Sequence, residues 1–315
     1  MKIIVTGGSG MVGRCIQDLT DLYSNHEFTF ISSTICDLTN REKTIQYFNK
    51  HNYDYIIHLA ADVGGLYKNM ENNISMFSNN IKINENVLEA CHLNNIKRGI
   101  FVLSSCIYPA NPSTFPMTEN MIHESPPHPS NEGYAYAKRM LEVQTRKYNE
   151  TYNYNYICVI PVNLYGPYDN FSLTDGHFIP AILRRFDKTK TIGNVYTSKY
   201  TAYGSGEPLR QFLFAPDFAF LITKILFEYN DNTPIICCND NEYTIKEVVH
   251  TICDMMQIEH RKLVWDTTKS DGCMRKTVSN YKLKSLFPNY KFTPLLEGLE
   301  HTYYWFISNE SNIRR

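Results

Sequence analysis

The sequence predicts an α/β protein: a Rossmann-like, doubly wound parallel sheet with a smaller C-terminal α/β substrate domain. Short apolar segments alternate with helical segments through the first half, and a glycine-rich turn joins the first strand to the first helix. The 315 residues, 43% of them hydrophobic, suffice for two unequal domains. We expect a nucleotide-binding domain over residues 1–164 and a substrate domain over residues 165–315, with some chain crossing back.

The expected strands of the first half are short, apolar and rich in Ile, Val, Phe or Tyr, as strands buried on both faces are. They are Lys2–Thr6, Glu27–Ser32, Tyr55–Leu59, Gly99–Ser104 and Tyr156–Val162. Helices are expected between them at Met11–Leu22, Arg41–Asn49, Ser75–Leu93 and Tyr134–Tyr152. After residue 164, Gly, Pro, Asn and Asp interrupt the pattern, which predicts shorter helices at Phe178–Phe186, Pro216–Tyr229, Ile245–Met256 and Leu295–Ile307.

Composition excludes several classes of protein. Lys and Arg number 31 against 32 Asp and Glu, so the net charge of -1 indicates no nucleic-acid or membrane-surface partner. No apolar run reaches about 18 residues, and no signal-peptide pattern precedes the first strand. The nine cysteines are scattered without a C-x-x-C pair, so we expect no metal site and a reducing, cytoplasmic location.

The turn after the first strand is the first candidate site. Glycines at 7, 10 and 13 let the backbone approach a pyrophosphate, and the following helix start supplies free N–H groups. This spacing resembles the short-chain dehydrogenase/reductase superfamily. The expected cofactor-binding residues here are Gly7, Gly8, Ser9, Gly10, Met11, Val12 and Gly13.

The end of the second strand distinguishes NADP from NAD. A carboxylate there would bind the ribose 2′-OH and repel a 2′-phosphate, but Ser32 and Ser33 occupy this position. Their hydroxyls favour NADP(H). Asp37 is given two equal roles, facing the adenine or capping its own loop. The other expected cofactor contacts are Leu38, Ala60, Ala61 and Pro161, with Tyr134, Lys138 and His177 near the nicotinamide.

Tyr134 and Lys138 form the expected catalytic pair. Their i, i+4 spacing puts them on one helical face, where the ammonium would lower the phenol pKa for proton transfer. Ser104 is expected to end the fourth strand and to polarise a substrate carbonyl with its hydroxyl. Tyr136 has no Lys four residues later, so it is not the candidate acid.

Beyond these residues, the chain resembles the GDP-L-fucose synthase family nearly end to end. The segments that carry the resemblance are Val63–Gly65, Ser104–Pro109, Asn131–Tyr134, Asn163–Pro167, Asp169–Phe171, Gly176–His177 and Thr268–Gly272. The resemblance implies GDP-4-keto-6-deoxy-D-mannose as substrate, epimerised at C3 and C5 and then reduced with NADPH at C4 to GDP-L-fucose. It also implies a homodimer that pairs the helices at 75–93 and 134–152.

The resemblance assigns roles to further residues. Cys106 and His177 match the family's acid–base pair, and Asn163 matches a sugar contact. Arg185, Arg210 and Lys276 match the positions that bind the GDP part, although neighbouring Arg184 and Arg275 leave the register open. Two departures stand out: Tyr203 replaces the usual Trp, leaving a smaller stacking surface, and Ser9 stands where some members have Arg.

Two other functions remain open at this point. The first is another nucleotide-sugar epimerase or dehydratase of the superfamily. Dehydratases carry an acidic pair after the catalytic Ser, where this chain has Ser105, Cys106 and Ile107. The second is a non-catalytic NADP-sensing protein, which would be expected to lose Tyr134 or Lys138.

Overall fold

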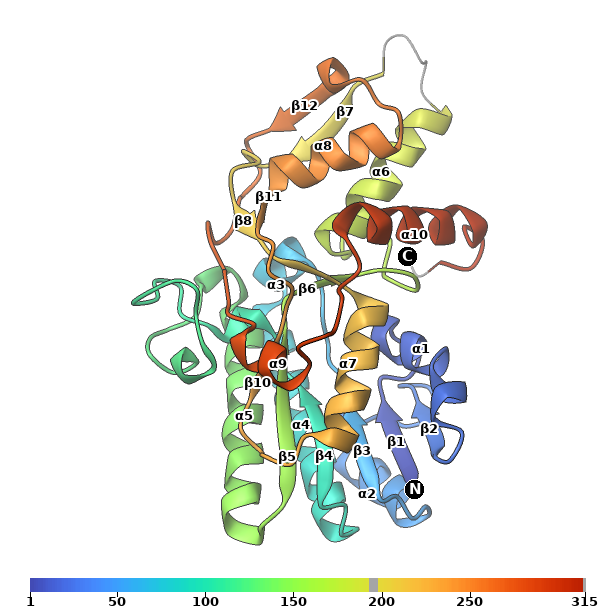
Figure 1. Ribbon diagram of the computed structural model, residues 1–315, viewed down its shortest axis with the longest axis vertical. Coiled ribbons are helices and arrows are strands. Elements are labelled where there is room, and N and C mark those ends of the chain that lie inside the picture. The colour runs from blue at the N-terminus through green and yellow to red at the C-terminus, as the bar shows by residue number, and fades with distance from the viewer. Residues whose placement is uncertain (193–197, 314–315) are drawn as a thin grey trace.

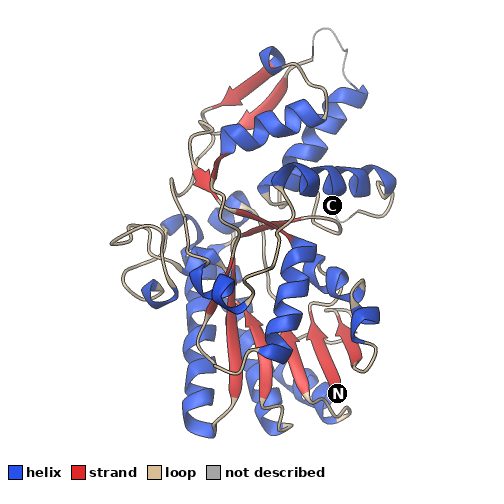
Figure 2. Cartoon of the chain, in the orientation of Figure 1, coloured by secondary structure: helices blue, strands red, loops and turns tan. Residues whose placement is uncertain are grey.

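The computed structural model describes residues 1–192 and 198–313 and is built on one six-stranded parallel sheet (Figures 1 and 2). The strand order is β10-β5-β4-β3-β1-β2. The bounds are β1 Lys2–Thr6, β2 Glu27–Ile31, β3 Tyr55–His58, β4 Arg98–Val102, β5 Asn155–Pro161 and β10 Ile235–Cys237. The chain changes direction across the sheet between β1 and β3, so a crevice is expected there at the carboxyl ends. The doubly wound parallel sheet predicted from the sequence is confirmed.

Helices cover both faces of this sheet. α1 (Met11–Gln17) and α7 (Ala215–Glu228) pack together on one face. α2 (Arg41–Asn49), α4 (Asn73–Leu93) and α5 (Glu132–Tyr152) form the layer on the other face. The strands between these layers are apolar along their length because both faces are buried; Ile3, Ile4, Ile56, Ile57 and Ile100 have no exposed surface.

Two predicted elements of the first half end at least two residues earlier than expected. The first helix stops at Gln17, and a separate 3₁₀ turn follows at Thr20–Tyr23. β4 ends at Val102, so the prediction that Ser104 ends this strand was wrong. Ser104 instead caps the 3₁₀ turn Ser105–Ile107, because its Oγ accepts a hydrogen bond from the Cys106 amide at 3.3 Å.

The second half builds the upper part of the molecule in Figure 1 but also returns to the sheet. α6 (Phe178–Ile192), α8 (Ile245–Met255) and α10 (Leu295–Ser308) surround a second hydrophobic cluster. Short strands that the sequence did not predict form three pairs: β6 (Asn163–Tyr165) with β9 (Phe212–Phe214), β7 (Tyr200–Tyr203) with β12 (Leu263–Asp266), and β8 (Leu209–Arg210) with β11 (Tyr243–Thr244). The expected start of α8 is confirmed by a capping box between Thr244 and Glu247.

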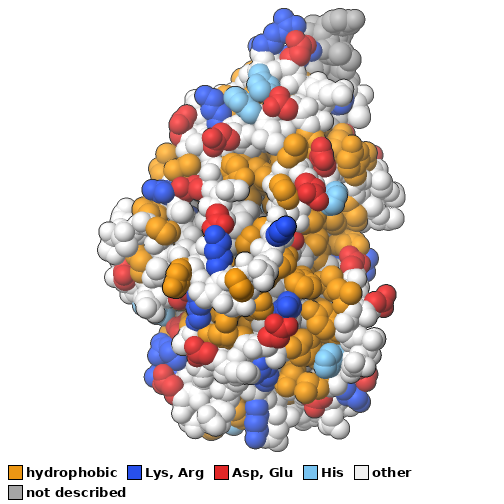
Figure 3. All heavy atoms as spheres, in the orientation of Figure 1, with side chains coloured by type: hydrophobic (Ala, Val, Ile, Leu, Met, Phe, Trp, Pro, Cys, Tyr) orange, Lys and Arg blue, Asp and Glu red, His pale blue; other side chains and the backbone are white. Residues whose placement is uncertain are grey.

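Two short helices complete the connections, α3 (Leu66–Glu71) after β3 and α9 (Tyr281–Leu286) before α10. The surface mixes Lys and Arg with Asp and Glu over the face drawn in Figure 3. Over the described ranges, no helix combines the length and apolar character needed to cross a membrane.

Candidate active site

The turn between β1 and α1 forms a cradle that only glycine permits. Gly7 has φ of +71°, and a Cβ there would lie 2.9 Å from the Ala60 nitrogen. A Cβ at Gly13 would lie 2.6 Å from the Gly7 carbonyl oxygen. Gly10 precedes α1 without a side-chain cap, so first-turn amides are left for a ligand. This cradle fits a dinucleotide pyrophosphate. Ser9, Met11 and Val12 belong to the same segment of chain, and Ala61 directly follows Ala60.

The loop after β2 carries hydroxyls and one carboxylate. Ser32 and Thr34 share a hydrogen bond of 2.7 Å between their hydroxyls, and Ser33 is exposed. Asp37 accepts hydrogen bonds from the Thr39 hydroxyl at 2.7 Å and the Thr39 amide at 3.0 Å, which lower the pKa of this carboxyl. Of the two roles left open for Asp37, these contacts favour the loop cap. Leu38 is buried, and its carbonyl accepts a hydrogen bond from Asn86.

Tyr134 and Lys138 lie near the start of α5, with the Lys138 Nζ 5.9 Å from the Tyr134 ring centroid. The Nζ donates a hydrogen bond of 2.7 Å to the Val102 carbonyl at the end of β4. Burial lowers the pKa of Lys138 to about 8. Burial also raises the pKa of Tyr134, and the nearby Cys106 and Asp62 raise it further. The expected lowering of the phenol pKa by Lys138 was therefore wrong, because every group that shifts this pKa raises it and favours the protonated phenol.

A buried polar chain that the sequence did not predict underlies this pair. The Thr6 hydroxyl bonds to His58 Nδ1 at 2.7 Å, His58 Nε2 bonds to Asn84 at 3.2 Å, and the Asn84 amide donates to the Ala137 carbonyl at 3.4 Å. Burial, with the charge of Lys138, lowers the pKa of His58 to about 3. His58 is thus a neutral, structural group beneath the Lys138 turn.

Ser104 and Cys106 follow β4, at the edge of the sheet where Lys138 also lies. Cys106 is 7% exposed, and burial raises the pKa of its thiol. Lys276, the hydrogen bond with Ser104, and Lys138 each act in the opposite direction. Cys106 is therefore a buried thiol surrounded by groups that favour its thiolate.

Lys276, whose charge acts on this thiol, lies in a segment that backbone hydrogen bonds hold at both ends. The Met274 carbonyl accepts from the Leu209 amide at 2.8 Å, and the Thr277 carbonyl accepts from the Met117 amide at 2.9 Å. Burial lowers the pKa of both Lys276 and Arg210, whose positive charges also repel. The Asp271 and Glu242 charges also act on Arg210, but in residues 1–192 and 198–313 neither cation forms an ion pair, so the two cations favour an anionic ligand.

Arg184 and Arg275, the sequence neighbours of Arg185 and Lys276, contact other parts of the chain. Arg275 forms an ion pair with Glu242 at 2.9 Å, and Arg184 donates to the Phe171 carbonyl at 3.0 Å. Arg185 instead stacks on Tyr203, with its Cζ 3.8 Å from the ring centroid. Arg184 and Arg275 are thus engaged by Phe171 and Glu242, whereas Lys276 interacts electrostatically with Cys106 and Arg210.

Comparisons with known proteins agree with this geometry. The model of the NAD dependent epimerase/dehydratase family matches residues 3–237. A GDP-L-fucose synthase from Dictyostelium discoideum is 43% identical, covering 99% of this chain and 97% of its own. The chain belongs to the GDP-L-fucose synthase family. A solved GDP-L-fucose synthetase from Naegleria fowleri bound to NADP is 36% identical, has a TM-score of 0.91, and covers 100% of this chain and 95% of its own. A probable GDP-L-fucose synthase from Drosophila melanogaster is 39% identical over 100% of this chain and 99% of its own.

Two segments that carry the GDP-L-fucose synthase resemblance, Val63–Gly65 and Gly176–His177, lie side by side. The Gly65 amide donates a hydrogen bond of 3.0 Å to the Asp175 carbonyl, beside the Gly176–His177 turn. His177 is exposed directly before α6, and its carbonyl accepts from the Ala181 amide. Asn163 is exposed, and its side chain donates to the Gln211 carbonyl at 2.9 Å, while Pro161 is buried at the end of β5.

Sequence reasoning missed two groups near these residues. Tyr67 of α3 lies against Tyr203, and no motif marked it apart from its place after Val63–Gly65. His128 precedes α5, and its pKa is lowered by partial burial and by the charges of Lys276 and Arg210. Its Nδ1 lies 3.2 Å from the Ser130 amide that donates to it.

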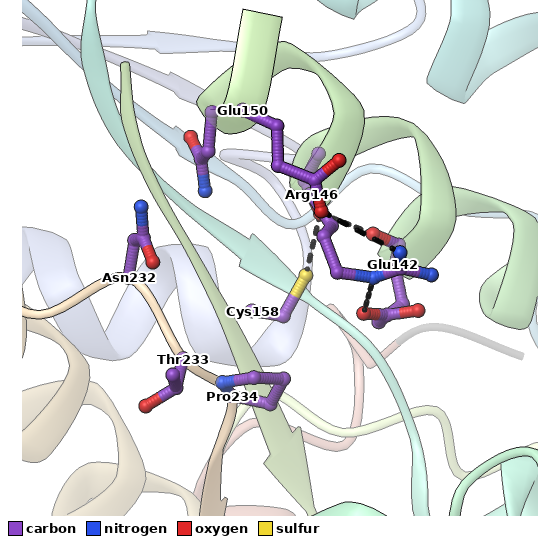
Figure 4. Close-up of a pocket in the computed structure, with 9 residues that line it drawn as sticks. Glu142, Arg146, Glu150, Cys158, Asn232, Thr233 and Pro234 are labelled. Atoms are coloured by element: carbon purple, nitrogen blue, oxygen red, sulfur yellow. Dashed lines mark hydrogen bonds and ion pairs between the residues drawn. The ribbon is translucent and has the colours of Figure 1, made fainter. Parts of the chain in front are cut away.

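A separate cavity of about 220 Å³ lies between the C-terminal half of α5, β5 and residues 232–234 (Figure 4). Asn149 on its wall is fifteen residues past Tyr134, which is about 22 Å along a helix. Its charged groups are paired with one another: Arg146 forms ion pairs with Glu142 at 3.0 Å and with Glu150 at 3.7 Å. This cavity is therefore distinct from the candidate active site.

Proposed function

We propose that this protein converts GDP-4-keto-6-deoxy-D-mannose to GDP-L-fucose by epimerisation at C3 and C5 followed by NADPH-dependent reduction at C4. The observation that carries the proposal is a thiol, Cys106, lying in the electrostatic field of the Tyr134 and Lys138 pair and of Lys276. A reductase needs only the Tyr and Lys. A second proton-transfer group beside them supports an epimerase that works on the same bound sugar.

Epimerisation begins with the acidity of the protons next to the C4 ketone. We assign the base to Cys106, which takes a proton from C3 or C5, and the acid to His177, which returns one to the opposite face. Ser104 donates a hydrogen bond to the C4 oxygen as negative charge develops there. Exposure of His177 supports this role, because it allows the imidazole to regain its proton from water.

Reduction uses the same bound ketone. When bound, NADPH supplies the hydride to C4. Tyr134 gives its proton to the C4 oxygen, a role supported by the raised pKa that keeps this phenol protonated. Lys138 holds the nicotinamide ribose, while the glycine cradle from Gly7 to Gly13 binds the pyrophosphate.

The nucleotide end of the substrate needs cations, and we assign Arg185, Arg210 and Lys276 to it. Arg guanidinium groups match the two-oxygen geometry of a phosphate. Asn163 is assigned to the sugar. His128 stands beside two of these cations as a further hydrogen-bond donor, since its Nδ1 accepts from the Ser130 amide and leaves the proton on Nε2.

We also propose a homodimer built on α4 and α5. These helices pack side by side and expose apolar residues: Ile74 is 81% exposed, Phe77 40% and Met140 38%. Such side chains on adjacent helices favour a partner. Light scattering after gel filtration tests this, with Phe77→Glu expected to give monomers and Tyr304→Glu, on α10, expected to leave the dimer intact.

The two-domain division at residue 164 and a cytoplasmic location complete the proposal. All nine cysteines lie in the described ranges and are free thiols, which supports a reducing compartment. The return of α7 and β10 to the sheet supports a nucleotide-binding domain completed by the later chain.

The experiment that tests the activity has two stages. Purified protein is first incubated with GDP-4-keto-6-deoxy-D-mannose in D₂O without NADPH, and deuterium at C3 and C5 is read by NMR. NADPH is then added, and loss of its absorbance is followed with identification of the product. Exchange at both carbons followed by formation of GDP-L-fucose is expected. Reduction without exchange would contradict the epimerase assignment.

A further inference from the structure

Tyr67 is an aromatic residue of the nucleotide-binding half that reaches the substrate half. It lies in α3, and its ring centroid is 6.2 Å from that of Tyr203 at the end of β7, with the ring planes at 85°. Edge-to-face contact of this kind fixes the tilt of one ring against the other. Tyr67 therefore constrains a residue 136 positions later in the sequence.

The Tyr203 ring that Tyr67 contacts also stacks against a cation. The Arg185 Cζ lies 3.8 Å from the Tyr203 ring centroid, and the Lys269 Nζ lies 5.5 Å from it. A guanidinium stacked at 3.8 Å takes its plane from the ring beneath it. The Tyr203 ring thus serves Arg185, whereas the sequence predicted a stacking surface for the sugar.

Arg185 keeps donors for a ligand. One of its five N–H groups reaches the Thr201 carbonyl at 3.4 Å, and within residues 1–192 and 198–313 it forms no ion pair with a carboxylate. Asp271, whose charge acts on Tyr67 and Arg210, accepts a hydrogen bond from the Ser205 amide at 2.7 Å. A stacked guanidinium with unused N–H groups is prepared for a phosphate oxygen pair.

We infer that Tyr67 is a positioning residue for the nucleoside diphosphate part of the substrate, acting through Tyr203 to set the plane of Arg185. This inference rests on the proposed function, because it takes the ligand of Arg185 to be a GDP sugar. Tyr67 and Tyr203 come from opposite halves of the chain, so their contact also fixes the distance between α3 and the Arg185 side of the crevice.

GDP binding tests the inference separately from turnover. Isothermal titration of the NADPH-bound protein with GDP is expected to give a dissociation constant about tenfold higher for Tyr67→Ala, the size of one lost aromatic or cation–π contact. Tyr67→Phe keeps the ring and is expected to stay within about twofold of wild type. Tyr281→Ala, which removes a 79% exposed tyrosine of α9, is the control and should change nothing.

A double-mutant cycle distinguishes positioning from direct contact. In a Tyr203→Ala background, Tyr67→Ala should cost no further GDP affinity, because the ring through which it acts is gone. Additive losses, or unchanged GDP affinity in Tyr67→Ala, would overturn the inference. Wild-type protein that binds GDP but neither exchanges nor reduces the keto sugar would overturn the proposed function while the Tyr67 result stood. Wild-type protein that fails to bind GDP would overturn both.

Discussion

The amide of Gly65 donates a hydrogen bond of 3.0 Å to the carbonyl of Asp175, two residues before His177. Gly65 follows β3, whereas Asp175 lies in the substrate half, three residues before the start of α6. A Cβ at Gly65 would lie 2.5 Å from the Gly176 carbonyl oxygen, a backbone atom that cannot turn aside. This contact thus sets how closely the His177 turn approaches the carboxyl edge of the sheet.

We predict that Gly65→Ala impairs epimerisation more than reduction. The added methyl group would displace the Gly176 carbonyl and move His177 with it, and a shift of about 1 Å in a reacting group costs about 100-fold in rate. Deuterium exchange and single-turnover reduction of pre-epimerised sugar measure the two steps separately. Val63→Ala is the control, because it only shortens a side chain that is 45% exposed. Equal loss of both steps would contradict a role specific to His177.

Tyr134→Phe should remove most of the reduction. The variant keeps the ring against Lys138 but loses the proton donor, and general acid catalysis contributes about 10²–10⁴-fold. NADPH affinity, measured by fluorescence titration, should stay near wild type. Tyr136→Phe is the matched control on the same helix, where the ring faces Arg139 at 5.6 Å. Reduction by Tyr134→Phe at the wild-type rate would remove Tyr134 from the mechanism.

The elements that the sequence predicted well are those set by local pattern. β1 and α2 have the bounds that were expected, since an apolar strand and an Asn40-capped helix need no distant partner to be recognised. Ser104 was misassigned to a strand because its capping hydrogen bond to the Cys106 amide has no strong sequence signal. The short strands from Asn163 onward were missed because a strand of two to four residues is too short to show a hydrophobic periodicity in the sequence.

The site residues also divide into those that local sequence reveals and those that depend on contacts between distant segments. Tyr134 and Lys138 are four residues apart, so one helix brings them together and the sequence reveals them. The pKa of Tyr134 is raised mainly because the rest of the fold buries its side chain, so the direction of this pKa shift was predicted wrongly from the sequence. The contact of Tyr67 with Tyr203 joins distant segments of the chain, and only the folded chain reveals it.

The cofactor preference should respond to one charge at Ser33. An aspartate at this exposed position after β2 would repel a 2′-phosphate, so Ser33→Asp should reduce the preference for NADPH over NADH by roughly tenfold. Ser33→Ala removes only the hydroxyl and should have a smaller effect. The ratio of kcat/KM with the two cofactors measures the preference. An unchanged ratio in Ser33→Asp would mean that the 2′-phosphate lies away from this loop.

Cys106→Ser should abolish exchange at C3 and C5. The pKa of a hydroxyl lies far above that of a thiol, so at neutral pH the variant lacks the base. Ser104, Tyr134 and Lys138 are retained, so slow reduction should remain. Cys273→Ser is the control, because Cys273 is the other thiol within the field of Lys276. It should retain exchange. Full exchange in Cys106→Ser would leave Cys106 as a core residue only.

The pH dependence of deuterium exchange at C3 and C5 should reveal how the charge of Lys276 affects the ionisation of Cys106. Burial raises the pKa of Cys106, and the positive charge of Lys276 lowers it by favouring the thiolate. Exchange should therefore rise with pH until the thiol is ionised, and loss of the charge in Lys276→Met should move the midpoint upward by roughly one pH unit, the effect of one nearby charge in a partly buried site. Below the midpoint, that shift makes exchange about tenfold slower at a given pH.

The measurement must separate this effect from weaker substrate binding, because Lys276 is also assigned to the diphosphate. Exchange is therefore followed at saturating GDP-4-keto-6-deoxy-D-mannose across pH, so that the midpoint reports the bound enzyme. Arg275→Met removes the neighbouring cation, which pairs with Glu242, and should leave the midpoint where it is. A wild-type midpoint in Lys276→Met would mean that another group sets the ionisation of Cys106, and an equal shift in Arg275→Met would mean that the whole segment from Met274 to Thr277 had moved.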